Sequence, residues 1–108
     1  MTVSGSTLSG NSAWRGGGIY TSGSFATVTV GGSILSGNSA SYAGGGIYND
    51  LANGGRGQQS TVTVENSSKI TGNTAPAGYG PDVYNLGWLY LDGSSTLGIL
   101  DGNPAKPI

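Results

Sequence analysis

The chain has 108 residues, which is enough for at most one domain. Four basic and five acidic residues give a net charge of −1, and the sparse charge, with no basic stripe, argues against nucleic-acid binding. Cysteine and histidine are absent, which excludes a disulfide framework, a thiolate metal site and any Ser–His or Cys–His catalytic pair.

The first unit of the chain, Met1–Tyr20, holds three short β-like pieces. The alternating piece is Met1–Val3, the second ends in Leu8–Asn11, and the third is Gly18–Tyr20. Gly, Ser and Asn, which favour turns, lie between them. No window has the i, i+3, i+4, i+7 apolar spacing of a helix, so we expect strands throughout.

These pieces recur along the chain in the same order. The second piece, with the sequence LSGNSA, occupies Leu8–Ala13 and Leu35–Ala40 and returns in looser form at Ile70–Ala75; the others recur as TVTV at Thr27–Val30 and Thr61–Val64, and as GGGIY at Gly16–Tyr20 and Gly44–Tyr48. A single coil cannot bury its own apolar face, so it needs near-copies of itself above and below. The repeats therefore predict an all-β parallel solenoid of three to four coils, with three short strands per coil.

Stacked coils place equivalent residues in columns, which we expect at three positions. The expected columns are Asn11, Asn38 and Asn73 at a corner, Ile19, Ile47 and Val83 inside, and Val30 and Val64 inside. Corner asparagines can adopt φ > 0 and hydrogen-bond along the stack through their amides. A β-sandwich is the alternative fold, but it requires alternation without the same residue at the same place in each unit.

The repeat spacing predicts a single β-helix domain over residues 1–100. The expected divisions are coils at about 1–26, 27–60 and 61–87, a partial or capping coil at 88–100, and a tail at 101–108. The tail is expected because Pro104 and Pro107 cannot continue a central strand. The short repeat number suggests a fragment of a longer solenoid.

Candidate partner contacts lie at one corner and in one long loop. Trp14 and Tyr42 occupy equivalent corners, where each is either a ring lying over glycines or a sugar-stacking platform; we favour the first reading. The insertion between Asn49 and Ser60 is either a partner-contact loop or a drifted insertion without a role. Its candidate contact residues are Asp50, Arg56, Gln58 and Gln59.

Two further patterns have a functional and an ordinary interpretation. Thr2, Thr29 and Thr63 are expected to point outward on one wall, either as ordinary β formers or as a short ice-binding array. Glu65 and Asp92 share a register position, and stacked carboxylates could act on a glycosidic bond or bind calcium. Two exposed turn acids are the simpler reading, which we prefer. No metal or cofactor is expected.

The repeated phrases resemble those of right-handed parallel β-helix proteins of bacterial surfaces. The phrase Gly-Gly-Ile at 17–19 and 45–47, and Ser-Gly-Asn ending at Asn11 and Asn38, are similar to the repeat of chlamydial-type polymorphic outer membrane proteins and adhesin-like passenger domains. The likeness covers roughly Met1–Asn85 and departs at Asn73 and at 80–82. The resemblance implies a right-handed coil, secretion, surface display and adhesion, and it carries no catalytic residues to transfer.

We therefore expect a non-catalytic cell-surface or secreted segment with a structural or adhesin-like role. The alternatives are a fragment of a β-helical polysaccharide lyase or hydrolase, and ice binding through the threonine wall. The expected partners are glycans or surface proteins, further coils or a second copy of the chain, and no membrane span is expected. We expect no signal peptide within this sequence, and the expected location is the outside or outer membrane of a bacterium.

Overall fold

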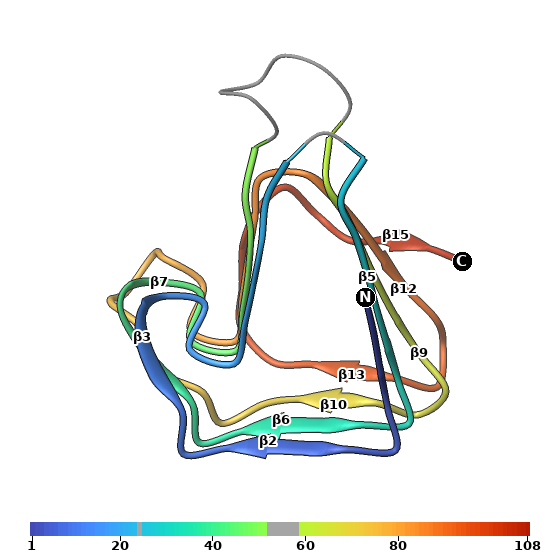
Figure 1. Ribbon diagram of the computed structural model, residues 1–108, viewed down its shortest axis with the longest axis horizontal. Coiled ribbons are helices and arrows are strands. Elements are labelled where there is room, and N and C mark those ends of the chain that lie inside the picture. The colour runs from blue at the N-terminus through green and yellow to red at the C-terminus, as the bar shows by residue number, and fades with distance from the viewer. Residues whose placement is uncertain (24, 52–58) are drawn as a thin grey trace.

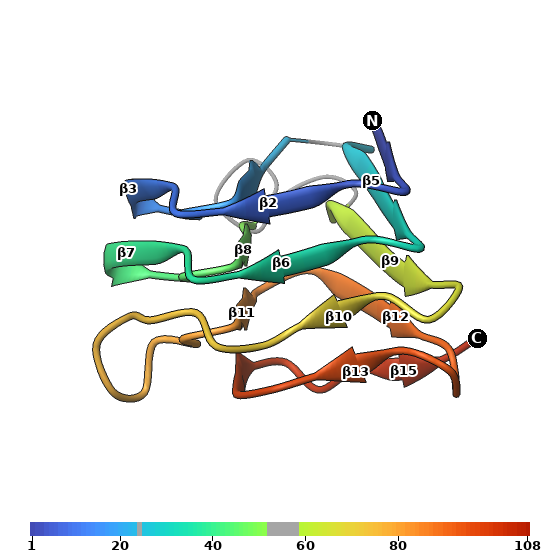
Figure 2. The same ribbon diagram turned by 90° about the horizontal axis from the view of Figure 1, so that it is seen from below.

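The computed structural model describes residues 1–23, 25–51 and 59–108 of the chain. In these residues the regular elements are β-strands that pair in parallel with the equivalent strands of the next coil. In Figure 1 the chain runs clockwise while it recedes from the viewer, and Figure 2 shows the coils lying one below another from the N-terminus to the C-terminus. The coil is therefore right-handed, and the predicted parallel β-helix is confirmed.

Three sheets run through the stack and a fourth lies at one corner. The first sheet is β1 (Thr2–Ser4), β5 (Thr27–Gly31), β9 (Thr61–Glu65), β12 (Trp88–Leu91) and β15 (Lys106–Pro107). The second is β2 (Thr7–Ser9), β6 (Ile34–Ser36), β10 (Lys69–Ile70) and β13 (Thr96–Leu97). The third is β4 (Ile19–Thr21), β8 (Ile47–Asn49), β11 (Val83–Asn85) and β14 (Leu100–Gly102), and the fourth is β3 (Ser12–Arg15) and β7 (Ser39–Ala43).

The register between coils places like residues directly over one another. Each of the first three sheets contributes an apolar column, namely Val3, Val30, Val64 and Leu91; Leu8, Leu35, Ile70 and Leu97; and Ile19, Ile47, Val83 and Leu100. The members in the two central coils are completely buried. Each such side chain stabilises the fold by roughly 1.5–3 kcal/mol relative to an exposed one, so the central coils hold most of the core.

The fourth sheet adds an element to the three strands per coil that the sequence predicts. β3 and β7 pair outside the triangular core and form an arm that projects from one corner (Figure 1). An isolated parallel bridge between Ser39 and Thr74 continues this pairing into the third coil. The arm was not predicted because SASYA, the sequence of β7, has no run of alternating large apolar residues.

Residues 101–108 do not form the predicted tail. Most of β14 and all of β15 fall in this segment, and they extend the third and the first sheet by one strand each. Pro107 pairs with Leu91 in β15, which is the outermost strand of its sheet. An edge strand needs no donor on its outer side, so the proline is compatible with this position.

Candidate functional site

The corner asparagines form a hydrogen-bonded column. The Oδ1 atom of Asn38 accepts bonds from the backbone N–H and the Nδ2 of Asn11, at 3.1 and 3.0 Å. The Oδ1 of Asn73 accepts the same two bonds from Asn38, both at 3.0 Å. Asp82 ends the column, because its Oδ1 accepts from the backbone N–H and the Nδ2 of Asn73, both at 2.9 Å.

The positive φ expected at these asparagines lies instead one residue earlier. Gly37, which precedes Asn38, has φ 68°, and the equivalent glycines of the other coils have the same geometry. Glycine adopts this conformation without the steric cost of a Cβ atom, so the asparagine keeps its amide free for the column. The division of roles explains why the repeated phrase is Gly-Asn rather than Asn alone.

The structure contains two further polar columns that were not predicted from the sequence. The hydroxyl of Ser33 accepts a bond from the backbone N–H of Ser6 at 3.1 Å, and the hydroxyl of Ser68 accepts the same bond from Ser33. Asn49 donates from Nδ2 to the Oδ1 of Asn85 at 2.8 Å. Serine and asparagine are common in any turn, so only their equal distance from the repeated phrases could have revealed these columns.

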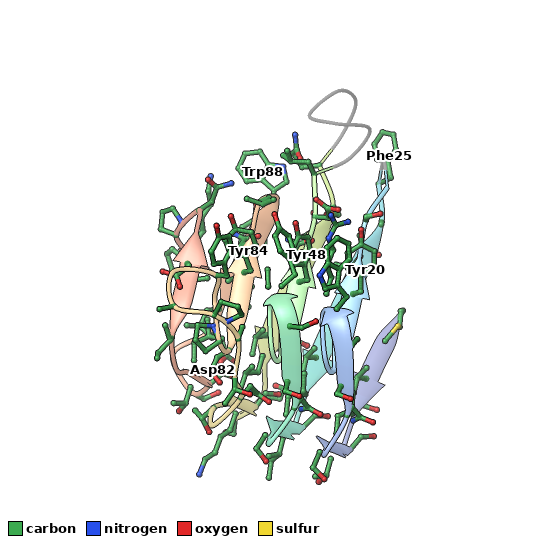
Figure 3. The ribbon with its side chains drawn as sticks, turned by 90° about the vertical axis from the view of Figure 1, so that its left-hand side faces the viewer. Tyr20, Phe25, Tyr48, Asp82, Tyr84 and Trp88 are labelled. Atoms are coloured by element: carbon green, nitrogen blue, oxygen red, sulfur yellow. The ribbon has the colours of Figure 1, made fainter. Side chains whose placement is uncertain are left out.

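Six aromatic rings form two columns on the side of the arm. Trp14, Tyr42 and Tyr79 stack at ring-centroid distances of 5.1 and 5.6 Å along the arm. The tyrosines of the third sheet, Tyr20, Tyr48 and Tyr84, stack at 5.4 Å each, and Figure 3 shows them in a row across the coils. We call these six residues, together with Arg15, the aromatic cluster.

Arg15 and a pair of tyrosines join the two columns. The guanidinium carbon of Arg15 lies 4.6 Å from the ring centroid of Trp14, 5.2 Å from that of Tyr42 and 5.7 Å from that of Tyr48. Its Nε–H is buried and has no hydrogen-bond partner among the described residues. At the other end of the cluster Tyr79 lies 6.0 Å from Tyr84. The cation–π contacts therefore hold the arm against the third sheet.

The cluster is buried in its middle and exposed at its edges. Tyr48 is 4% exposed, whereas Trp14, Tyr20 and Tyr79 are 61%, 46% and 40% exposed. Burial raises the pKa of Tyr48 to about 12, and the nearby carboxylate of Asp50 acts in the same direction. Tyr48 is therefore a neutral phenol at physiological pH, and the exposed rings surround it.

The loop residues predicted as partner contacts divide into two groups. Arg56 and Gln58 lie outside the described residues. Asp50 accepts a hydrogen bond from the Tyr20 hydroxyl at 2.7 Å, so it borders the aromatic cluster. Gln59 is partly buried at the far end of the loop, and its Oε1 has no partner among the described residues.

The threonines that were predicted to point outward on one wall form a short column in the structure. Thr2, Thr29 and Thr63 are successive partners in the first sheet, and the array then continues as Tyr90 and Lys106. The threonine surface therefore extends over three coils. Ice binding remains one of the predicted alternatives.

Glu65 and Asp92 occupy neighbouring rungs, where Asp92 serves a turn. Its carboxylate accepts bonds from the backbone N–H groups of Asn66, Ser94 and Ser95 and from the Ser94 hydroxyl. These bonds, led by the one from Asn66, lower the pKa of Asp92 below its ordinary value of 3.8. A general acid needs a raised pKa, so the shift is opposite to that expected of a catalytic acid.

In the described part of the chain no group of three or more Asp or Glu side chains is placed to hold a metal ion.

Replacing Asp92 by Ala is expected to weaken the fold at neutral pH and to reduce its sensitivity to acid. Because the folded pKa is lowered, the stability contributed by Asp92 is complete above pH 3.8 and is lost as the pH falls through the lower folded value. Urea unfolding of both chains at neutral pH and below pH 3.8 measures the difference. The control is Glu65→Gln, since among the described residues the carboxylate of Glu65 accepts a single bond, from the Asn66 amide at 3.4 Å. A wild-type advantage that stays constant into acid would contradict the assignment.

The fold and the columns define the chain as a right-handed parallel β-helix repeat protein. Residues 5–22 and 31–50 match the model of the Chlamydia polymorphic membrane protein repeat, which confirms the resemblance seen in the sequence. The matched segments contain the Gly-Asn corners of Asn11 and Asn38 and the first two Gly-Gly-Gly-Ile-Tyr phrases. No curated protein and no solved structure matches the chain. No helix in the described residues is long and apolar enough to cross a membrane.

Proposed function

We propose that the chain is a non-catalytic, surface-associated β-helix segment that binds a partner through the aromatic cluster, as an adhesin does. The match to a polymorphic membrane protein repeat supports the surface association. The exposed edge of the cluster carries the binding role, because Trp14, Tyr20 and Tyr79 present large rings to solvent on one side of the molecule. Aromatic residues and arginine are the types that dominate the binding energy of protein interfaces.

Three properties of the cluster suit recognition. Its rings are held by stacking on one another, so little side-chain entropy is lost on binding. The guanidinium of Arg15 lies among them, 4.6–5.7 Å from three ring centroids, and adds a positive charge beside the apolar surface. Asp50, fixed by the Tyr20 hydroxyl, adds an acceptor at the border. A partner with a mixed apolar and polar surface, a glycan or a surface protein, fits these groups.

Replacing Trp14 and Tyr20 together by Ala is expected to weaken partner binding by tenfold or more. A tenfold loss corresponds to about 1.4 kcal/mol of binding free energy. Both rings are exposed, so the variant should fold and give the circular dichroism of the wild type. The measurement is binding of the labelled chain to an array of glycans and surface proteins. Ile34→Ala is the matched control, because Ile34 is a 43% exposed apolar residue of the second sheet.

Two results would contradict the proposal. If the Trp14 and Tyr20 variant bound its array partners as tightly as Ile34→Ala, the aromatic cluster would not be the binding surface. If the chain shortened any polysaccharide in a depolymerisation assay, the non-catalytic part would be wrong. The predicted alternative of a polysaccharide lyase or hydrolase fragment would then take its place.

A further inference from the structure

The rings of the aromatic cluster form one continuous path of contacts through the first three coils. In order along the path they are Trp14, Tyr42, Tyr79, Tyr84, Tyr48 and Tyr20. Neighbouring centroids are 5.1–6.0 Å apart, and the ring planes are tilted by 35–54°. Phenol and indole rings give up one electron more readily than other apolar side chains, so the cluster is also a set of one-electron donors in contact.

One phenol of this path has a proton acceptor already in place. The hydroxyl of Tyr20 donates to Oδ2 of Asp50 at 2.7 Å, a length typical of a bond to a charged oxygen. Asp50 is fixed there by its backbone, whose N–H donates to the Thr21 oxygen at 2.8 Å and whose oxygen accepts from the Ser60 hydroxyl. A phenol that loses an electron becomes a strong acid, so an acceptor within hydrogen-bond reach lets the proton leave with the electron. Tyr20 is therefore prepared for oxidation.

The charges around the cluster direct oxidation to the same ring. A ring that loses an electron gains positive charge, so a neighbouring cation opposes the loss and a neighbouring anion favours it. The guanidinium carbon of Arg15 lies 4.6 Å from the centroid of Trp14 and 5.2 Å from that of Tyr42. The carboxylate of Asp50 lies against Tyr20, which is 46% exposed and open to an oxidant. Arg15 therefore protects the rings of the arm, and Asp50 favours the loss of an electron from Tyr20.

The ring in contact with Tyr20 is that of Tyr48. The two tyrosines are register partners in β4 and β8, with centroids 5.4 Å apart and planes tilted by 41° (Figure 3). Tyr48 is 4% exposed, so the packing around it holds its ring in place. Two groups held in contact react as though each were present at a very high concentration. Coupling between these two rings is therefore favoured over coupling of Tyr20 with a second chain.

We propose that Tyr20 and Tyr48 are a modification site, where oxidation by peroxide forms a dityrosine cross-link between the first and second coils. Each phenol loses one electron and one proton, and the proton of Tyr20 passes to Asp50. The ring carbons ortho to the two hydroxyls then form a C–C bond, and the hydrogen on each joined carbon moves to the phenol oxygen. The pair has then lost two hydrogen atoms, which reduce one hydrogen peroxide to two waters. The bond fastens the first coil, whose core side chains Val3 and Leu8 are only partly buried.

The test is oxidation of the dilute full chain with hydrogen peroxide and a haem peroxidase, followed by dityrosine fluorescence and by peptide mapping with mass spectrometry. The expected product is a monomer that lacks two hydrogen atoms and has Tyr20 joined to Tyr48, formed at a rate independent of chain concentration. Tyr20→Phe should abolish the cross-link. Asp50→Asn should slow it at least about tenfold, the low side of the effect of a positioned proton acceptor. Tyr90→Phe is the matched control and should react as the wild type does, because Tyr90 lies in β12, outside the aromatic cluster.

Three outcomes would overturn the proposal. They are the absence of dityrosine in the oxidised wild type, a cross-link that joins two chains or other tyrosines, and a wild-type rate in Asp50→Asn. Phenylalanine keeps the ring at position 20, and circular dichroism before oxidation reports whether each variant is folded. The reaction contains no binding partner, so its result is independent of the array experiment.

Discussion

Replacing Asn38 by Ala is expected to lower the free energy of unfolding by roughly 3 kcal/mol, because it removes four side-chain hydrogen bonds that contribute about 0.5–1.5 kcal/mol each. Asn38 is completely buried. Its Nδ2 donates to the backbone oxygen of Leu8 at 2.9 Å and to the Oδ1 of Asn73, and its Oδ1 accepts from Asn11. Alanine removes all these bonds while the backbone groups stay in the stack.

Urea unfolding at neutral pH measures the loss. Asn11→Ala is the matched control, because Asn11 is exposed and begins the column, where its amide donates to Asn38. The control should lose less than about 1 kcal/mol, as expected for one partly exposed hydrogen bond. Equal losses in the two variants would show that the column contributes no more at its buried centre than at its end.

The column also has a direction, and this accounts for a departure from the repeat. Each asparagine accepts at Oδ1 from the coil before it and donates from Nδ2 to the coil after it. The last member needs only to accept, and a carboxylate accepts without donating. Asp82 fills this position where earlier coils have Gly18 and Gly46, and its Oδ2 accepts a further bond from the backbone N–H of Ile99.

The register of the coils could be predicted because only one alignment of the repeats keeps their apolar side chains in the core. Val28 and Val30 must face the core, and a slip of one residue against Val62 and Val64 would turn every valine to solvent. The same argument applies to the Gly-Ile-Tyr phrase. Identical residues at identical places therefore determine the stacking of the first three coils without knowledge of any loop.

The aromatic cluster could be predicted only in part. The corner positions of Trp14 and Tyr42 follow from the repeat, but Tyr79 has no matching phrase around it. The contact between the arm and the third sheet depends on how far β3 and β7 project, which no local pattern encodes. The role of Arg15 could not be predicted, because its contacts with the rings of Tyr42 and Tyr48 depend on how the arm lies against the third sheet.

The pairing of the C-terminal segment with β12 was missed for a different reason. Pro104 and Pro107 mark the end of regular structure in most sequences, and the segment was predicted as a tail. The structure uses it as an edge strand, which brings Lys106 over Trp88. An edge strand pairs on one side only, so it needs little of the alternation that identifies a strand in sequence.

Replacing Gly45 by Ala is expected to destabilise the fold by roughly 3 kcal/mol, at the upper end of the usual cost of overpacking a buried site. A Cβ atom at this position would meet the backbone oxygens of Thr74 and Pro81 in the next coil, closer than any real contact. Backbone cannot swing aside as a side chain can. The second and third coils would have to separate, which would lengthen the bond from the Gly46 N–H to the Pro81 oxygen, now 3.1 Å.

The measurement combines urea unfolding with amide hydrogen exchange, which should accelerate at Gly46 and Ile47, whose N–H groups bond to the third coil. Gly93→Ala is the matched control, because a Cβ there has no atom within 4 Å and the backbone is not in the left-handed region. The control should change the stability by no more than about 0.5 kcal/mol. If Gly45→Ala behaved like the control, the glycine at this corner would serve the turn alone. The close approach of neighbouring coils would then not be the reason that the repeat keeps it.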